Sequence, residues 1–518
     1  MSKMIRTRSA LEHFASGRLP EAAEVCKEIL SEQPDEPDAL HVLGLVQLQS
    51  GKHREAIACL RRALDLRPED AHYAYNLGLA WQNSGQTDEA MLCYEKAAML
   101  QPDFFQAHDN LGTLHQEKGQ FEIARRLHER ALSCKPDHIP ALSNLGMALQ
   151  ECGEIEGALS CYEKALSLVP DHPELINNMG YALEQKGRPD EALAFYLKAL
   201  VLKPDYAKAR FNLSLMLLLS GNYGQGFELY ESRFNGNREM SGSRKVLESL
   251  SGISQWRGEN LEGKRILIWA DQGLGDMLMM LRYLPLMKGE IAVSCDPALN
   301  RLVEGMKGVS IVDDSMRMEC FDFHSPVMSL PLAFGTDIDT IPSIFPYISV
   351  PENMKQSWAE KFAGMRGSRV GLVWAGGKRL RRDALRSMPP ESMKPLLDLK
   401  GAHYFSLQKG EAESGPRPFS IVDWMGECQD MLDTAAFIMN LDLVISVDTS
   451  VAHLAGALGK DVWLLNRFES EWRWMTDRDD SPWYPKMRIF RQDRPGDWKG
   501  VIAKAASALD AMLNRQDA

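Results

Sequence analysis

The sequence predicts an α-helical solenoid followed by an α/β part made of two doubly wound, Rossmann-like halves. In the first part, small residues and prolines recur with a period of 34 residues, which is typical of stacked helix pairs. In the second part, short apolar runs alternate with helical patterns, and this alternation predicts parallel sheets covered by helices. The length of 518 residues suits about three folding units.

Four positions keep the 34-residue period. They hold a glycine, two alanines and a proline: Gly44, Gly78, Gly112, Gly146 and Gly180; Ala56, Ala90, Ala124, Ala158 and Ala192; Ala63, Ala97, Ala131, Ala165 and Ala199; and Pro68, Pro102, Pro136, Pro170 and Pro204. Small residues let antiparallel helices approach closely, and proline ends the second helix because it has no N–H to donate. Less regular units at both ends extend the predicted array over residues 1–235. The pattern resembles the tetratricopeptide (TPR) family, whose stacked units present an extended concave surface.

An asparagine also recurs on the first helix of each unit. The set is Asn76, Asn110, Asn144, Asn178 and Asn212. A carboxamide has donors and an acceptor, so a ladder of them can bind the backbone of an extended peptide without reading its side chains. Resemblance to the TPR superhelix of O-linked N-acetylglucosamine transferases implies the same arrangement. The alternative is that these asparagines only help neighbouring units to meet.

Composition narrows the class of protein. The net charge of −12, from 59 basic and 71 acidic residues, argues against nucleic-acid binding, which needs clustered cations. No run approaches the roughly 18 apolar residues of a membrane span, and the first residues lack a signal peptide, so we expect a cytoplasmic protein. The nine cysteines include no CxxC pair, and we expect neither a metal nor a cofactor.

The second part is predicted to contain three segments after a polar linker or adaptor segment over residues 236–263. A short first half covers residues 264–350, a connection covers 351–368, and a second half covers 369–518. In doubly wound halves that face each other, a ligand lies between them, at the carboxyl ends of the strands.

The first candidate motif is "ADQGLGD", directly after the strand "RILIW". Gly273 and Gly275 allow the backbone to approach a ligand closely, and Asp276 lies at a helix start. A carboxylate that only caps the helix is the alternative interpretation. The chain has no Gly-Lys-Ser/Thr, which excludes a P-loop.

Two further motifs follow strands of the second half. A loop crowds five cations, Lys378, Arg379, Arg381, Arg382 and Arg386, and one cation that points into the cleft would suit a diphosphate. A solvated basic loop is the alternative. Gln408 and Lys409 lie in "SLQKG", again a strand followed by a turn.

The fourth motif is "VISVDTSVAHLAGALG". Asp448, Thr449 and Ser450 favour a helix start, whose free N–H groups and dipole make an anion site. His453 lies on the first turns and can face the same point, or it can be a buried structural histidine. We assign Asp448 to holding the turn, because a carboxylate repels phosphate.

These motifs resemble a known family. "DTSVAHLAGALGKDVWLLN" resembles the nucleotide-sugar site of the heptosyltransferase-like glycosyltransferases (glycosyltransferase family 9), which have the two-domain GT-B fold. "QGLGDMLMMLRYLP" resembles their N-terminal glycine–Asp motif, and "EWRWMTDRDDSPWYPKMRIFRQ" looks like the variant fused to TPR arrays. The resemblance covers roughly residues 255–500.

The resemblance implies metal-independent transfer of a sugar from a nucleotide-sugar donor, with inversion. It makes Asp276 the general base and assigns the donor site to Gly273, Gly275, Arg386, Gln408, Lys409, Asp448, Thr449, Ser450 and His453. Because the first half is short for an acceptor domain, the array would hold the acceptor, which favours a protein such as flagellin. The alternatives are a polysaccharide or lipid-linked acceptor, and a TPR adaptor whose GT-B domain is inactive.

Overall fold

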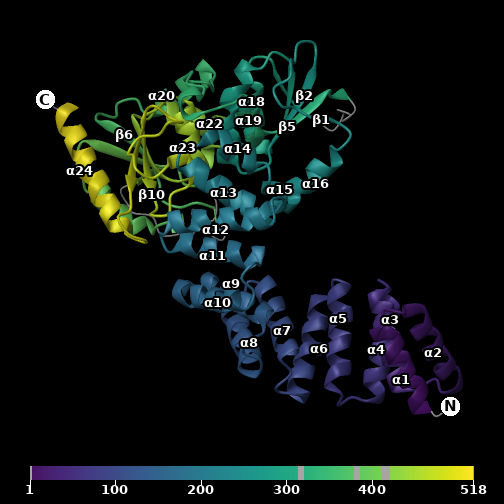
Figure 1. The fold of residues 1–518 in the computed structure, drawn as a ribbon. Helices are drawn as coiled ribbons and strands as arrows, with labels where there is room; N and C mark the ends of the chain where they lie inside the picture. Colours follow the sequence, from purple (N-terminus) through teal and green to yellow (C-terminus); the bar gives the residue numbers. More distant parts are fainter. Residues whose placement is uncertain (1–2, 313–319, 378–384, 410–420, 517–518) are drawn as a thin grey trace. The chain divides into compact units, whose positions relative to one another are not determined.

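The chain folds into two compact units, Met1–Pro204 and Asp205–Ala518 (Figure 1). The computed structural model describes residues 3–312, 320–377, 385–409 and 421–516. Four residues of the predicted basic loop, Lys378, Arg379, Arg381 and Arg382, lie outside the described residues.

The first unit is a solenoid of antiparallel helix pairs. Its helices are α1 (Lys3–Ala15), α2 (Leu19–Glu32), α3 (Pro37–Gln49), α4 (His53–Leu66), α5 (Ala71–Asn83), α6 (Thr87–Leu100), α7 (Phe105–Glu117), α8 (Phe121–Cys134), α9 (Ile139–Cys152), α10 (Ile155–Leu168), α11 (Pro173–Gln185) and α12 (Pro189–Leu202). The second helix of each pair ends two residues before a repeat proline, as the pattern predicted.

Small residues pack the two helices of each pair, as predicted. All ten repeat alanines are fully buried. Each repeat glycine lies against one side chain of the partner helix, in the order Leu60, Tyr94, His128, Tyr162 and Tyr196. A Cβ at Gly146 would lie 2.5 Å from Tyr162 Cε1, so a larger residue does not fit there.

A second glycine ladder, which the sequence analysis overlooked, closes the first helices. Its members are Gly17, Gly51, Gly85, Gly119, Gly153, Gly187 and Gly221, each 34 residues from the next and each with φ between +72° and +85°. A left-handed residue at a helix end favours glycine because other L residues are strained there.

The predicted array boundary at residue 235 does not coincide with the division after Pro204. The next helix pair, α13 (Ala207–Leu219) and α14 (Tyr223–Tyr230), belongs to the second unit. Its aromatic side chains explain this, because the Trp472 ring lies 5.6 Å from Phe227 and 6.3 Å from both Tyr223 and Tyr230.

The first sheet of the second unit is parallel in every strand pair, with the order β1-β5-β2-β3-β4. Its strands are β1 (Ser254–Gln255), β2 (Arg265–Trp269), β3 (Glu290–Ser294), β4 (Val309–Ile311) and β5 (Phe323–Pro326). The segment predicted as a linker supplies β1 and the helix α16 (Ser241–Ser249). Met240 and Leu250 from this segment share one apolar cluster with Leu267 and Trp269, so the segment packs against the first sheet.

The second sheet is also parallel in every strand pair, with the order β11-β10-β9-β6-β7-β8. Its strands are β6 (Ser368–Val373), β7 (Ala402–Ser406), β8 (Ile421–Asp423), β9 (Leu443–Val447), β10 (Val462–Asn466) and β11 (Met487–Arg491). The other helices of this unit are α15 (Arg233–Gly236), α17 (Leu274–Met280), α18 (Asn300–Glu304), α19 (Leu330–Ala333), α20 (Glu352–Lys361), α21 (Lys394–Leu397), α22 (Met431–Met439), α23 (Ser450–Ala457) and α24 (Trp498–Gln516). The prediction of two parallel sheets in an α/β part is confirmed.

We expect Gly146→Ala to lower the free energy of unfolding of the first unit by about 1–3 kcal/mol, because the new methyl group overpacks the Tyr162 ring. Chemical denaturation followed by circular dichroism measures this change. Gly157→Ala is the control, since its Cβ would meet only the movable Leu149 side chain at 3.3 Å. Equal effects of the two substitutions would contradict the packing role of Gly146.

Candidate functional site

Each sheet has one point where the strand order reverses. In the second sheet the reversal lies between β6 and β9, whose carboxyl ends lead into Trp374 and Asp448. In the first sheet it lies between β2 and β5, whose ends lead into Ala270 and Val327. Ligands of open parallel sheets bind at such reversals, so the polar residues of the two motifs, which follow these strands from Asp271 and from Asp448, lie where a site is expected.

The two motifs meet through their helices. The first turns of α17 and α23 pack together, and a Cβ at Gly275 would lie 2.7 Å from His453 Cδ2. Glycine at this position therefore permits the close contact, and the structure brings Gly275 and His453 together. Gly273 is the N-cap residue of α17.

Both carboxylate oxygens of Asp276 are engaged. Oδ2 accepts a hydrogen bond from the Gly273 N–H at 3.2 Å, which agrees with the capping interpretation, and Oδ1 forms an ion pair with Arg473. Burial raises the pKa of Asp276, and the charge of Arg473 opposes that increase. The carboxylate is thus half-buried, capped and paired.

Arg473 is a site residue that sequence reasoning missed. It lies in the short 3₁₀ helix η11 (Trp472–Trp474), and its guanidinium also bonds Glu471 at 3.1 Å and Gln272 at 3.5 Å. Burial lowers the pKa of Arg473, but the carboxylates of Asp276 and Glu471 raise it by more. The net change is upward, so Arg473 stays charged. The signal for it was present in "EWRW", where a cation lies between two tryptophans.

His453 is buried and held by aromatic neighbours. Its Nδ1 lies 2.9 Å from the Tyr484 hydroxyl, and the Trp474 ring lies 5.1 Å away. Burial lowers the pKa of His453 well below its usual value, and nearby arginines, including Arg473 and Arg282, lower it further. The imidazole is therefore neutral, so it can offer a hydrogen bond to a ligand but no positive charge.

Arg282 is the second arginine that the sequence analysis missed, although it interrupts the apolar run "MLMMLRYLPLM". It is 3% exposed, and its donors reach the carbonyl oxygens of Met279 and Trp483 at 2.8 Å. Its guanidinium lies 5.0 Å from the Tyr484 ring and 5.4 Å from that of Phe345. Among the described residues it has no ion-pair partner, so its charge adds to the positive potential at His453.

The predicted donor-site residues of the second sheet divide into two groups. Arg386 donates to the Asp448 carbonyl oxygen at 2.9 Å, which joins the loop after β6 to the start of α23. The Thr449 hydroxyl lies 3.0 Å from that of Ser446, and Ser450 is the first residue of α23. These residues gather at the strand reversal.

Gln408 and Lys409, by contrast, bond the protein's own backbone. The Gln408 amide both accepts from and donates to the backbone of Ala375 at 3.0 Å. Lys409 Nζ donates to the carbonyl oxygen of Cys428 at 2.5 Å. Both side chains thus support the loops that follow β6 and β8.

A buried ion network positions the loop after β2. Arg233 Nε donates to Asp271 at 2.8 Å, and its other nitrogens reach Glu231 at 2.7 Å and Ser329 at 2.8 Å. The second oxygen of Asp271 accepts from the Met328 N–H at 3.1 Å. The network thereby ties α14 and α15 to both strands of the first reversal.

The asparagine ladder lies within the first unit apart from Asn212, on α13. Nδ2 of each of three members bonds a residue 35 positions earlier: His41 at 2.7 Å for Asn76, Tyr75 at 3.2 Å for Asn110, and Asp109 at 3.2 Å for Asn144. These contacts link consecutive helix pairs, as the alternative interpretation described.

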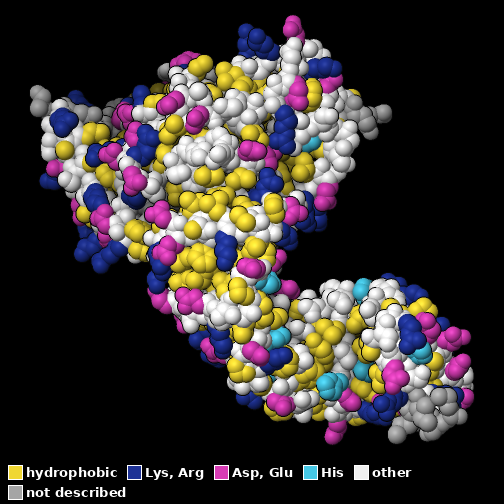
Figure 2. Space-filling view, in the orientation of Figure 1, with side chains coloured by type: hydrophobic (Ala, Val, Ile, Leu, Met, Phe, Trp, Pro, Cys, Tyr) yellow, Lys and Arg dark blue, Asp and Glu magenta, His cyan; other side chains and the backbone are white. Residues whose placement is uncertain are grey.

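Figure 2 shows that most histidines on the visible face belong to the first unit, which holds nine of the 12 in the sequence.

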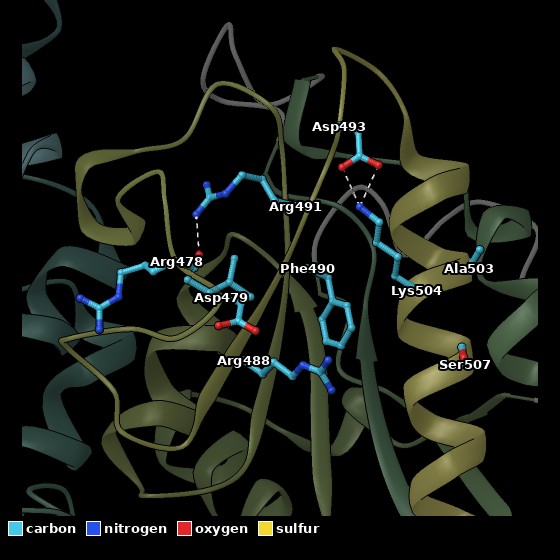
Figure 3. Close-up of a pocket in the computed structure, with 10 residues that line it drawn as sticks. Arg478, Asp479, Arg488, Phe490, Arg491, Asp493, Ala503, Lys504 and Ser507 are labelled. Carbon is cyan, nitrogen blue, oxygen red and sulfur yellow. Dashed lines mark hydrogen bonds and ion pairs between the residues drawn. The ribbon is translucent and has the colours of Figure 1, made fainter.

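A basic hollow of about 680 Å³ lies between β11 and α24 (Figure 3). Arg478, Arg488, Arg491 and Lys504 line it together with Asp479 and Asp493. Lys504 bonds Asp493 at 2.7 Å, and Arg478 bonds Asp480 at 2.5 Å outside the lining. None of the predicted site residues lines this hollow.

Comparison with known proteins identifies the repeats. Models described as tetratricopeptide repeat match residues 13–80, 71–104, 108–135 and 137–204. The first half of the chain contains TPR repeats. Repeats of this family suggest that the chain binds a protein or a peptide.

One curated relative and several solved structures are similar to parts of the chain. Protein FlbA of Caulobacter vibrioides is 25% identical over 334 residues, which are 58% of this chain and 54% of FlbA, so the chain spans about half of that protein. MamA is 25% identical with a TM-score of 0.30, over 32% of this chain and 97% of MamA. YrrB, described as a TPR protein with an unusual peptide-binding site, is 23% identical with a TM-score of 0.33, over 36% of this chain and 96% of YrrB.

Across the described ranges, no helix has both the length and the apolar character that a membrane crossing requires.

We expect Arg233→Met to lower the free energy of unfolding of the second unit by about 3–5 kcal/mol, because it leaves the Asp271 carboxylate buried without its cation. Thermal and urea unfolding measure this loss. The matched control is Arg257→Met, which removes a half-exposed partner of Glu231 and should cost at most about 1 kcal/mol. Similar losses for both variants would show that the network does not organise this unit.

Proposed function

We propose that the chain is a glycosyltransferase of GT-B type that transfers a sugar, with inversion, from a nucleotide-sugar donor to an acceptor. One observation carries this proposal: Gly275 of α17 contacts His453 of α23, so the strand reversals of two parallel sheets converge on one place. The resemblance of "DTSVAH" and "QGLGD" to the family 9 transferases supports the same assignment.

The chemistry assigned to the site follows from its charges. As the acceptor hydroxyl attacks the anomeric carbon, the bond to the nucleoside diphosphate breaks and negative charge develops on the leaving oxygen. The start of α23, with Thr449 and Ser450, and the cation of Arg386 are suited to stabilise that charge. Asp276 is the proposed acceptor of the hydroxyl proton.

We propose that the TPR array holds the acceptor, a protein such as flagellin or another surface protein. The presence of TPR repeats supports a protein or peptide partner. The engagement of both Asp276 oxygens is the specific observation that favours a second candidate, a TPR adaptor without transfer activity.

Calorimetry against UDP, GDP, ADP and CMP compounds tests the donor site. We expect one of them to bind, and we expect Asp276→Asn to reduce transfer from the matching nucleotide sugar by about 10²–10⁴-fold, because the proton acceptor is lost. Binding of none of these compounds would reject the transferase. Binding combined with full transfer by the Asn variant would reject Asp276 as the base and leave the donor site intact.

Replacing Asn76, Asn110 and Asn144 together by alanine tests the acceptor surface. If the ladder binds the acceptor backbone, KM for a modified protein identified by mass spectrometry should rise about tenfold while kcat stays unchanged. Asn83→Ala, an exposed asparagine on the same helix as Asn76, is the control. A loss of stability with an unchanged KM would assign the ladder to packing between units alone.

A further inference from the structure

Two adjacent residues of η11 carry buried hydrogen-bond donors that pair with none of the residues the structure describes. Arg473 is 8% exposed and Trp474 is fully buried. Among the described residues, neither Arg473 Nε nor Trp474 Nε1 has a hydrogen-bond partner. Such buried donors are rare in native proteins, because each has given up its hydrogen bond to water.

Both donors lie where the two sheets meet. Arg473 reaches Asp276 and Gln272 of the first half, while the Trp474 ring packs on His453 of the second half. The residue that follows, Met475, has φ +51°, a left-handed conformation that a residue other than glycine adopts only under strain. Strain of this kind concentrates where a segment must present its side chains in one arrangement.

The surroundings favour a negatively charged partner for these donors. Arg282 and Arg386 lie near His453 together with Arg473, and Arg282 is buried with no carboxylate partner in the described part of the chain. The carboxylates near Arg473 are those of Asp276, Glu471 and Asp448. A fourth, Asp271, lies in the loop after β2 and acts on Asp276. Glu471 and Asp276 are already bonded to the Arg473 Nη atoms, whereas Nε remains available.

We propose that Arg473 Nε and Trp474 Nε1 bind an oxyanion, such as a phosphate group of a diphosphate, and that Asp276 is the resident counter-ion that competes with this ligand for Arg473. The nature of the ligand as a nucleotide sugar rests on the proposed function, whereas the anion position rests on η11 itself. A guanidinium suits this task because it stays charged when buried and offers several donors in one plane.

Two substitutions distinguish the proposed anion site from a purely structural ion pair, because the proposal expects them to change the anion affinity in opposite directions. Arg473→Lys retains a charge but loses Nε–H, so the affinity for an oxyanion should fall about tenfold. Asp276→Asn removes the competing carboxylate, so the affinity for the same anion should rise about five- to tenfold. If the pair were only structural, both substitutions would loosen the site, and neither would strengthen binding.

The experiment is calorimetric titration of the full chain with inorganic pyrophosphate and, separately, with UDP, GDP and ADP. Arg478→Lys is the matched control, since it changes an arginine of the same segment that pairs with Asp480. Trp474→Phe keeps an aromatic ring beside His453 and removes the indole N–H together with part of the indole ring. It tests the donor even if Arg473→Lys does not fold, and we expect about threefold weaker binding. Circular dichroism confirms the fold of each variant.

Weaker binding by Arg473→Lys and Trp474→Phe, tighter binding by Asp276→Asn and no change in Arg478→Lys would support the proposal. Unchanged pyrophosphate affinity in folded Trp474→Phe and Arg473→Lys would overturn it, as would weaker binding by Asp276→Asn. Pyrophosphate binding that depends on Arg473, without binding of any nucleotide, would reject the transferase and retain the anion position. Nucleotide binding that neither Arg473→Lys nor Trp474→Phe changes would reject the anion position and retain the transferase.

Discussion

The buried ion network of Arg233 is the interaction on which the second unit depends. Its guanidinium and the Asp271 carboxylate are both fully buried, and Glu231 supplies a second negative charge. Burying charges is costly, and an apolar cluster of the same shape is often as stable. The ions instead fix the geometry, because their directional hydrogen bonds hold α14 and α15 against the end of β2 and the turn after β5. Since the next residues after Asp271 lead into α17, the position of Asp276 follows from this network.

The solenoid could be predicted from the sequence because its contacts repeat with the period of the chain. Gly146 meets Tyr162 only 16 positions later, and every unit repeats that distance. The predicted end of the array at residue 235 differs from the division between the two compact units after Pro204. The 34-residue period correctly describes α13 and α14 as a helix pair, but it does not show which residues pack against that pair. Trp472 decides where they belong, and it lies more than 200 residues further along the chain.

The site was predictable where it lies at strand ends and unpredictable where it depends on the meeting of two sheets. Residues such as Gly275 and Thr449 follow apolar strands, and parallel strands place their carboxyl ends together. Arg473 reaches Asp276 from 197 positions away, and no local pattern specifies that pair. Arg282 shows the same limit: a charge inside an apolar run signals a buried role, but its partner Trp483 is 201 positions distant. Because these partners are so distant in the chain, the sequence "EWRW" by itself assigns no role to Arg473.

The ion pair between Arg473 and Asp276 also bears on how this site can work. A general base must accept a proton, and an oxygen bonded to a guanidinium is a poor acceptor because its charge is already neutralised. Burial raises the pKa of Asp276, and the nearby charge of Arg473 opposes that increase and so favours the carboxylate form. In the proposed anion site, Arg473 satisfies both requirements: it favours the carboxylate form of Asp276 when no anion is bound, and it binds Asp276 less tightly once an anion shares its charge. In the proposed anion site, this arrangement links the state of the carboxylate on α17 to the occupancy of the site beside α23.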